Sequence, residues 1–385
     1  MTVSKMIFFL VVIFGSSSWM GTNSVWMQLP LLTTDLPEQW GLPSYLAAVV
    51  QYCLFRNFFK YSIVKSEIEC GSNSLGLVFF WRTTAWLGEK HYSVVLYILL
   101  FGLALVNAIS NVLFMPFMSQ FHHAYLNAYF IGMGFSALVP SLLSIVQGTT
   151  NYECNGDSPH YFPPRFSVSV FFLIVFFWTC MATACFIILY RETLHKLSSS
   201  NVLHPPTSHI TGISYAFVLV ATALVNAQMN GVIPSIQSYA ALPYSQFGQS
   251  KYYKYLFMKF TKFVLVYLHF FIFFRSISLL AVLTVLSSCV TSFIIYLASL
   301  SPNFIFNSMV GGSALSIISV LMAAGLHSYL RVVFASLLRE GHQSESRLFW
   351  CGVFIQIGSF IGSAVMFPLV NVFHVFTPSP TCPST

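Results

Sequence analysis

Phe166–Tyr190 reads FSVSVFFLIVFFWTCMATACFIILY and contains no charged side chain. An α-helix rises 1.5 Å per residue, so about 20 apolar residues cross the roughly 30 Å hydrocarbon core of a bilayer. Comparable apolar runs recur along the chain at Met6–Trp26, Tyr92–Met115, Tyr125–Gln147, Ile210–Ile233, Leu279–Leu300, Val310–Leu338 and Leu348–Phe373. Together these eight runs predict an all-α polytopic membrane protein.

The overall composition supports the same fold class. The 385 residues are 56% hydrophobic and only 7% charged, whereas an ordinary soluble domain has about 25% charged residues. A soluble fold of this size would need a charged shell to stay dispersed. The apolar surface must therefore face lipid.

Three weaker stretches raise the expected number of transmembrane helices to about eleven: Pro43–Phe55, Leu75–Leu87 and Tyr252–Phe274. The first two are short for a membrane crossing, and the third contains three lysines. A cleaved signal peptide is the alternative for the first run of the chain. The continuation of that run to Trp26 argues against cleavage.

A polar stretch, Arg191–His209, divides the chain between two sets of apolar runs. We expect an N-terminal bundle of about six spans at 1–190, with atypical second and third spans, and a cytoplasmic linker at 191–209. A C-terminal bundle of about five spans at 210–375 and an extracellular tail at 376–385 follow. Two joined bundles (6+5) are typical of transporters.

The charge distribution favours a cytoplasmic N-terminus. In that orientation the inside loops hold nine cations: Lys5, Arg56, Lys60, Lys65, Arg191, Lys196, Arg275, Arg339 and Arg347. The outside loops hold five: Arg82, Lys90, Arg165, Lys251 and Lys254. Cytoplasmic loops of membrane proteins carry the excess of Lys and Arg. The net charge of +7 is thus a topology signal and does not indicate a nucleic-acid partner.

Four internal prolines predict helix kinks: Pro116, Pro140, Pro234 and Pro368. Each lacks the amide hydrogen that would pair with the carbonyl four residues earlier, so that carbonyl needs another partner. Kinked helices line cavities in transporters, and Pro234 is the strongest candidate for such a role. Prolines are also simply more frequent in membrane helices than in soluble ones, which remains the alternative.

Two polar stripes are candidates for the lining of a solute path. Asn226 and Asn230 are four residues apart and share a helix face, which should point into the bundle. Interhelical hydrogen bonds that only hold the bundle together are the alternative. Trp19, Asn23 and Trp26 form a second stripe suited to a flat aromatic ligand, although an interfacial aromatic belt would also place tryptophans there.

The chemistry of the spans argues for a neutral solute. Apart from Arg331, the confident spans hold almost no ionisable residue, which argues against a charged substrate or a carboxylate proton relay. No catalytic constellation and no metal-ligand spacing is present, so we expect no enzyme, no metal and no cofactor. Cys154 and Cys382 both fall in segments assigned to the outside, which leaves a disulfide between them open.

Several motifs resemble the eukaryotic riboflavin transporters, the vitamin B2 solute carriers. They are WMQLP at Trp26–Pro30, DLPE at Asp35–Glu38, LPSYL at Leu42–Leu46, NGVIPSIQSY at Asn230–Tyr239 and MFPLVNV at Met366–Val372. The resemblance covers residues 1–51, about 80–249 and about 276–375. It implies eleven spans, a plasma-membrane location and transport of riboflavin without a cofactor.

The resemblance also implies which residues bind the substrate, with rings stacking on the isoalloxazine and amides orienting the ribityl chain. The candidates are Trp19, Asn23, Gln51, Asn226, Asn230, Gln237 and Tyr239. Gln28, Asn107 and Met133 stand where acidic residues are expected in relatives. Facilitative transport without strong proton coupling is therefore the expected mechanism.

Two alternatives to riboflavin transport stay open at this point. One is a nucleoside-type carrier, because ribose and a base ask for similar contacts. The other is a non-transporting receptor or a defective family member. Residues 52–79 and 250–274 depart from the family pattern, and we hypothesise that they derive from translated intron or a mispredicted exon.

Overall fold

The computed structural model describes residues 4–38, 42–52, 63–119, 123–148, 152–155, 158–197, 212–241, 276–303, 305, 309–340 and 344–377. Several sequence-based expectations lie outside these residues: most of the 191–209 linker, the weak span Tyr252–Phe274 and Cys382 in the tail. Of Cys154 and Gln51, only the backbone is described. The possible disulfide therefore stays a prediction.

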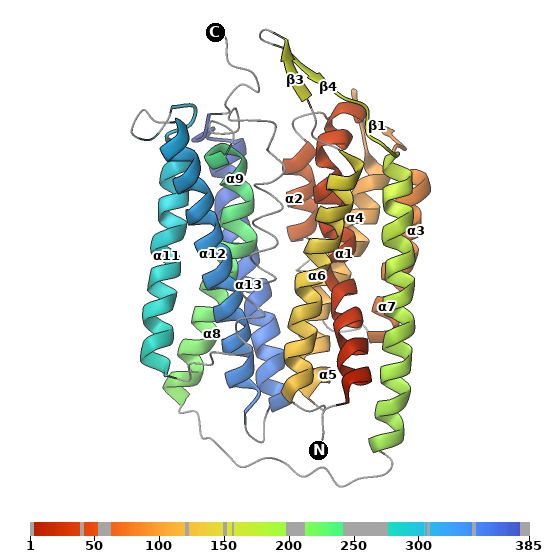
Figure 1. Cartoon of the computed structure of the whole chain (residues 1–385), viewed down its shortest axis with the longest axis vertical. Coiled ribbons are helices and arrows are strands. Elements are labelled where there is room, and N and C mark those ends of the chain that lie inside the picture. Colours follow the sequence, from red (N-terminus) through yellow and green to blue (C-terminus); the bar gives the residue numbers. More distant parts are fainter. Residues whose placement is uncertain are drawn as a thin grey trace.

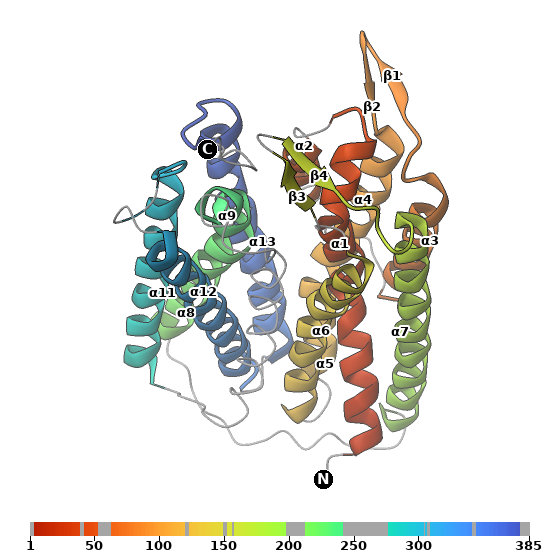
Figure 2. The ribbon, with the colours of Figure 1, turned by 45° about the horizontal axis from the view of Figure 1, so that its top comes forward.

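The helices of the first part of the chain form one group (Figure 1). They are α1 (Lys5–Asp35), α2 (Leu42–Tyr52), α3 (Ile63–Phe80), α4 (Val94–Ile109), the π-helix η3 (Ser110–Phe114), α5 (Met115–Ser119), α6 (His123–Gln147) and α7 (Val168–Leu197). Two antiparallel hairpins lie at one end of this group (Figure 2): β1 (Ala85–Leu87) with β2 (Lys90–Tyr92), and β3 (Tyr152–Asn155) with β4 (Ser158–Tyr161).

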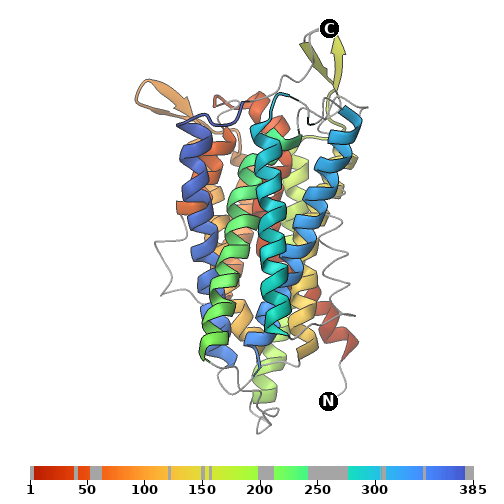
Figure 3. The ribbon, with the colours of Figure 1, turned by 90° about the vertical axis from the view of Figure 1, so that its left-hand side faces the viewer.

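The remaining helices form a second group beside the first (Figure 1). They are α8 (Gly212–Asn226), the π-helix η4 (Ala227–Val232), α9 (Ile233–Ala241), α11 (Ile277–Ser299), α12 (Met309–Leu338) and α13 (Ser344–Asn371). Figure 3 shows the long helices of both groups running along the same axis of the molecule.

The predicted fold class is confirmed. Eight stretches of the described chain are long and apolar enough to cross a membrane, and they correspond to the eight runs found in the sequence. Three boundaries differ from expectation. α1 continues beyond Trp26 and through Pro30 to Asp35, and α7 continues to Leu197. The expected Leu75–Leu87 span is wrong, because the helix there ends at Phe80 and a hairpin with Gly88 at φ +67° follows.

Three apolar clusters show how the two groups are joined. The largest includes Ile7, Val11 and Phe14 from the start of α1 together with Leu330–Leu338 from the end of α12 and Leu348–Ile355 from the start of α13. At the opposite end each group has a separate cluster, one around Leu32, Leu100 and Phe171, and the other around Ile236, Ile294 and Met366. The two groups thus share an apolar core at the end that holds the N-terminus (Figure 1).

Glu38, from the DLPE motif, anchors the loop after α1 to the start of α4. Its carboxylate accepts hydrogen bonds from the Ser93 amide at 2.5 Å, the Ser93 hydroxyl at 2.8 Å and the Tyr97 hydroxyl at 2.7 Å. A carboxylate at this position also complements the positive end of the α4 dipole. The motif is therefore accounted for by packing at this end of the molecule.

Small residues let α13 pack directly on α8 and η4. A Cβ at Gly358 would collide with the carbonyl oxygen of Ala223, and a Cβ at Gly362 with the carbonyl oxygen of Ala227. A Cβ at Gly231 would lie 2.6 Å from the carbonyl carbon of Gly362. Gly358 and Gly362, which have the GxxxG spacing, therefore make a backbone-to-backbone crossing.

We predict that Gly362→Val destabilises the protein by about 1–3 kcal/mol, because the added side chain forces two backbones apart in a packed crossing. The measurement is thermal unfolding in detergent. Gly212→Ala is the control, since a Cβ there meets nothing within 4 Å. Equal stability of the two variants would contradict the crossing.

Candidate functional site

The site is built around helices whose regular hydrogen bonding is interrupted. η3 lies directly before Pro116, and η4 runs into Pro234. Single-turn π-helices inside α-helices occur frequently at functional positions. Two of the four predicted kink prolines thus follow irregular backbone, one in each helix group. Pro140 and Pro368 lie inside α6 and α13, and α1 adds Pro30, which the sequence interpretation missed.

Asn23 satisfies the carbonyl that a proline leaves unpaired. Pro140 has no amide hydrogen for the Ser136 carbonyl, and the Asn23 side chain donates to that oxygen at 3.2 Å. The Asn23 amide also lies 3.4 Å from the Ser136 hydroxyl. Asn23, predicted to bind the substrate, therefore uses its side-chain amide in a hydrogen bond that joins α1 to α6.

Trp19 lies one turn before Asn23 on the same face of α1. Its indole Nε1 is buried and has no hydrogen-bond partner among the described residues. By contrast, the indole of Trp178 donates to the Ser16 hydroxyl at 2.8 Å. A buried N–H without an acceptor costs free energy, so Trp19 holds a donor ready for a ligand acceptor.

Asn226 and Asn230 lie side by side, as their spacing predicts, and Asn230 reaches α13. Asn226 is fully buried and donates to the Thr222 carbonyl at 2.8 Å. Asn230 donates to the Ser359 hydroxyl of α13 at 3.0 Å and lies 3.4 Å from the Asn226 side-chain oxygen. The two amides thus form a polar seam beside the glycine crossing, and Asn230 keeps partial exposure.

On the other side of η4, a buried polar cluster joins α11 and α12. Gln228 accepts at Oε1 from His327 Nε2 at 2.9 Å, and its Nε2 donates to the Ser288 hydroxyl at 2.7 Å. The Thr291 hydroxyl lies 3.3 Å from the same Gln228 oxygen. His327 is fully buried.

The sequence interpretation missed His327, which lies inside an apolar run where an ionisable residue is a functional signal. The expectation that Arg331 is almost the sole ionisable residue of the eight apolar runs is therefore wrong, because His327 lies in the same run. Arg331 itself is buried one turn further along α12.

Gln356 connects the two helix groups at middle depth. It is a buried residue of α13, and its side chain donates to the Ala108 carbonyl of α4 at 3.1 Å. Ala108 lies two residues before Ser110, the first residue of the π-helical segment η3. This hydrogen bond lies near the inner limit of the shared apolar core, which also contains Ile355.

Other predicted site residues lie elsewhere. The Tyr239 ring packs against the Phe376 ring in a tilted arrangement with a centroid distance of 5.6 Å, within the apolar cluster around Ile236, Ile294 and Met366. Gln237 is half-buried on α9, and Gln51 lies on α2. The structure thus brings Asn226 and Asn230 together and leaves Tyr239 in a packing contact.

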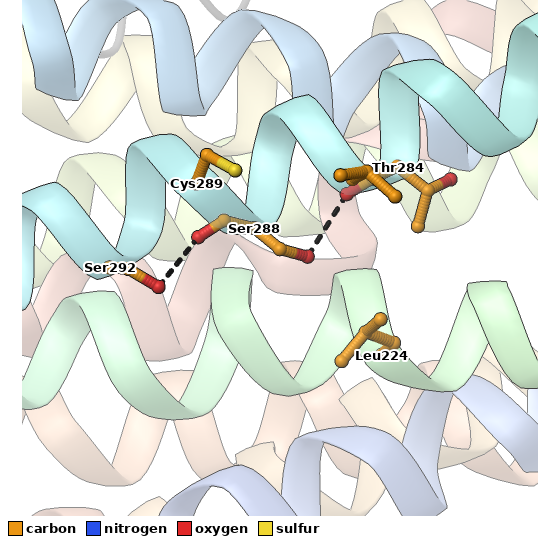
Figure 4. Close-up of a pocket in the computed structure, with 6 residues that line it drawn as sticks. Leu224, Thr284, Ser288, Cys289 and Ser292 are labelled. Carbon is orange, nitrogen blue, oxygen red and sulfur yellow. Dashed lines mark hydrogen bonds between the residues drawn. The ribbon is translucent and has the colours of Figure 1, made fainter.

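A separate cavity of about 420 Å³ lies between α8 and α11 and is lined by Leu224, Thr284, Val285, Ser288, Cys289 and Ser292 (Figure 4). The Ser288 and Ser292 hydroxyls bond back to carbonyls of their own helix at 3.0 Å and 2.9 Å. Val285 is 64% exposed, so this cavity opens on the outer face. It is therefore distinct from the polar seam.

The chemistry of the polar seam is that of neutral donors and acceptors. Its amides and hydroxyls can hold a ligand with ring nitrogens, carbonyls and hydroxyls. Among the described residues, no Asp or Glu lies within the membrane-crossing stretches away from their ends, and no group of three metal-ligating side chains occurs.

Comparisons with known proteins agree with this chemistry. The sequence model described as solute carrier family 52, riboflavin transporter, matches residues 3–208 and 192–378. The chain is 52% identical over 422 residues to riboflavin transporter rft-1 of Caenorhabditis elegans, covering 97% of this chain and 98% of the relative. It is 48% identical to rft-2 of the same organism, with both chains fully covered.

Solved structures show the same fold at low sequence identity. The chain resembles the human organic anion transporter MFSD10, with a TM-score of 0.57 and 9% identity over 96% of this chain and 94% of that chain. It also resembles the major facilitator superfamily transporter FucP, with a TM-score of 0.52 and 14% identity over 95% and 91%.

For the polar seam, we predict a favourable coupling energy of about 0.6 kcal/mol between Asn230 and Ser359, a typical value for an interhelical hydrogen bond in a membrane protein. Unfolding free energies of Asn230→Ala, Ser359→Ala and the double variant would give this value. Fully additive effects would show that the two side chains do not interact. The pair Asn371→Ala and Ser359→Ala is the control, because the Asn371 side chain donates to the Phe367 carbonyl of its own helix at 3.1 Å and, among the described residues, does not bond to Ser359.

Proposed function

The chain belongs to solute carrier family 52, the riboflavin transporters, and we propose that it takes up riboflavin across the plasma membrane by facilitative alternating access. The observation that carries this proposal is the family match along nearly the whole chain, including all the helices that build the polar seam. The protein is a multi-pass membrane transporter and not an enzyme.

The solute fits the chemistry of the candidate residues. Isoalloxazine is flat and has carbonyl and ring-nitrogen acceptors, which suit the unpaired indole N–H of Trp19. The ribityl hydroxyls both donate and accept, as do the side chains of Asn226, Asn230 and Ser359. Asn23, Gln51, Gln237 and Tyr239 complete the proposed set, with Tyr239 the weakest member because it packs on Phe376.

Alternating access is supported by the distribution of apolar cores. The two helix groups share a core at the N-terminal end and have separate cores at the other end. A polar seam at middle depth would then be reached from the end where the cores are separate. With the N-terminus in the cytoplasm and the C-terminus outside, that end is extracellular, and the arrangement corresponds to an outward-facing carrier.

Facilitative transport is supported by the neutral side chains found at middle depth in the described membrane-crossing stretches. Proton-coupled carriers commonly use an intramembrane Asp or Glu, and the described crossing stretches have none away from their ends. The positive charges of the chain fit a cytoplasmic N-terminus, since Lys5, Arg339 and Arg347 lie at the end with the shared core.

We predict saturable uptake of labelled riboflavin in cells that lack their own transporter. Unlabelled flavins should compete with the label, whereas nucleosides at the same concentration should not. Uptake no higher than in mock-transfected cells would reject the proposal in favour of a non-transporting protein. Equal competition by nucleosides would favour a nucleoside-type carrier.

We also predict that in Gln356→Leu the two helix groups separate more often at the end that holds the N-terminus. The substitution removes the hydrogen bond from the Gln356 side chain to the Ala108 carbonyl, which joins the two groups. A loss of about 1 kcal/mol shifts a two-state equilibrium about five-fold. Cys351 is fully buried in the shared core, so its reaction with a maleimide reports the opening.

This measurement requires a background in which the other cysteines are replaced by alanine. Asn371→Leu is the matched control, because it removes an amide of the same helix that bonds to the Phe367 carbonyl within that helix. An unchanged labelling rate of Cys351 in Gln356→Leu would show that the Gln356–Ala108 bond does not hold the groups together.

A further inference from the structure

η4 is held by side-chain hydrogen bonds in two opposite directions. Toward α13, Asn230 reaches Ser359. Toward α11 and α12, Gln228 reaches Ser288 and His327. The two sets of contacts leave from residues only two positions apart, so they brace the π-helical turn between three neighbouring helices.

The polarity of the Gln228 contacts determines the state of the histidine ring. An amide oxygen only accepts hydrogen bonds, so His327 must carry a hydrogen on Nε2 to bond at 2.9 Å. The Gln228 NH₂ group donates to Ser288. Both ends of the Gln228 amide are therefore occupied, with His327 as the donor to its oxygen.

η4, the segment held by these contacts, could also adopt the hydrogen-bond register of an α-helix. A π-helical turn contains one more residue than the α-helical turn that could replace it, and the Asn230 carbonyl has no amide partner at Pro234. Loss of the extra residue from the turn would rotate one flank against the other by about 100°, the angle per residue of an α-helix. Asn226 and Asn230 would still share a helix face, but that face would turn relative to α9 and lose the present contact between Asn230 and Ser359.

We propose that His327 is a positioning residue for solute recognition, which acts through Gln228 to keep η4 in the register that presents Asn226 and Asn230 to the solute. It does not contact the solute itself. This inference rests on the proposed riboflavin transport and adds to it a specific role for a buried residue of α12. Gln228 is only 7% exposed and His327 is fully buried, so the bond is shielded from water.

The test compares the kinetics of riboflavin uptake, normalised to the amount of protein at the cell surface. His327→Leu should raise KM about ten-fold while the normalised maximal rate changes less than two-fold. His327→Gln should restore most of the affinity, because a glutamine places an N–H donor at a similar distance along the side chain as histidine Nε2. Ser319→Ala is the control on the same helix, since its hydroxyl bonds to the Ser316 carbonyl within α12 at 3.0 Å.

A second variant approaches the same bond from the other side. Gln228→Leu should raise KM at least as much as His327→Leu, because it also removes the contacts with Ser288 and Thr291. The double variant should be no worse than Gln228→Leu alone, because the bond between Gln228 and His327 is already lost in that variant. If His327→Leu does not reach the cell surface, the KM values of Gln228→Leu and His327→Gln are compared with that of the unmodified protein instead.

Three outcomes would overturn the inference: an unchanged KM in His327→Leu or Gln228→Leu, an affinity in His327→Gln as poor as that of His327→Leu, or additive effects in the double variant. An absence of saturable uptake by the unmodified protein would instead reject the proposed function. The two failures are therefore distinguishable.

Discussion

Inside a bilayer, a polar group that has no partner within the protein has none at all, and this constraint organises the structure. Asn23 supplies the donor that Pro140 removes from the Ser136 carbonyl. Gln356 reaches the Ala108 carbonyl beside η3, and Gln228 and Asn230 brace η4 from opposite sides. The irregular backbone of both helix groups is thus tolerated because side chains of neighbouring helices complete its hydrogen bonding.

The same constraint explains why the middle of the molecule suits a neutral solute. Charges there would require buried counter-charges, whereas amides and hydroxyls pair with one another and exchange those partners for a ligand at small cost. The glycine crossing of α13 against α8 and η4 places this polar seam on closely packed backbone. An apolar core shared at one end and divided at the other leaves the seam at the level where the two groups begin to separate.

The individual site residues show how far sequence reasoning extends. Asn226 and Asn230 lie side by side because residues four apart share a helix face, and the sequence predicts this directly. Asn23 was selected for its polarity, but its hydrogen bond to a proline-freed carbonyl depends on how α1 meets α6. Tyr239 belongs to a matching motif but packs on Phe376 from the far end of the chain. His327 lies within an apolar run, where an ionisable residue indicates a functional position, and the sequence interpretation missed it.

The hydrophobic runs determine the fold class and the positions of eight membrane-crossing helices, because bilayer thickness imposes a length that a single chain segment must satisfy alone. The GxxxG spacing of Gly358 and Gly362 likewise indicates a tight helix crossing from local sequence alone. Which helix lies across that crossing, which carbonyl each amide satisfies and where the two cores merge depend on the packing of segments distant in sequence. Periodicity within one segment cannot specify these relations, since they arise from the joint arrangement of all the helices.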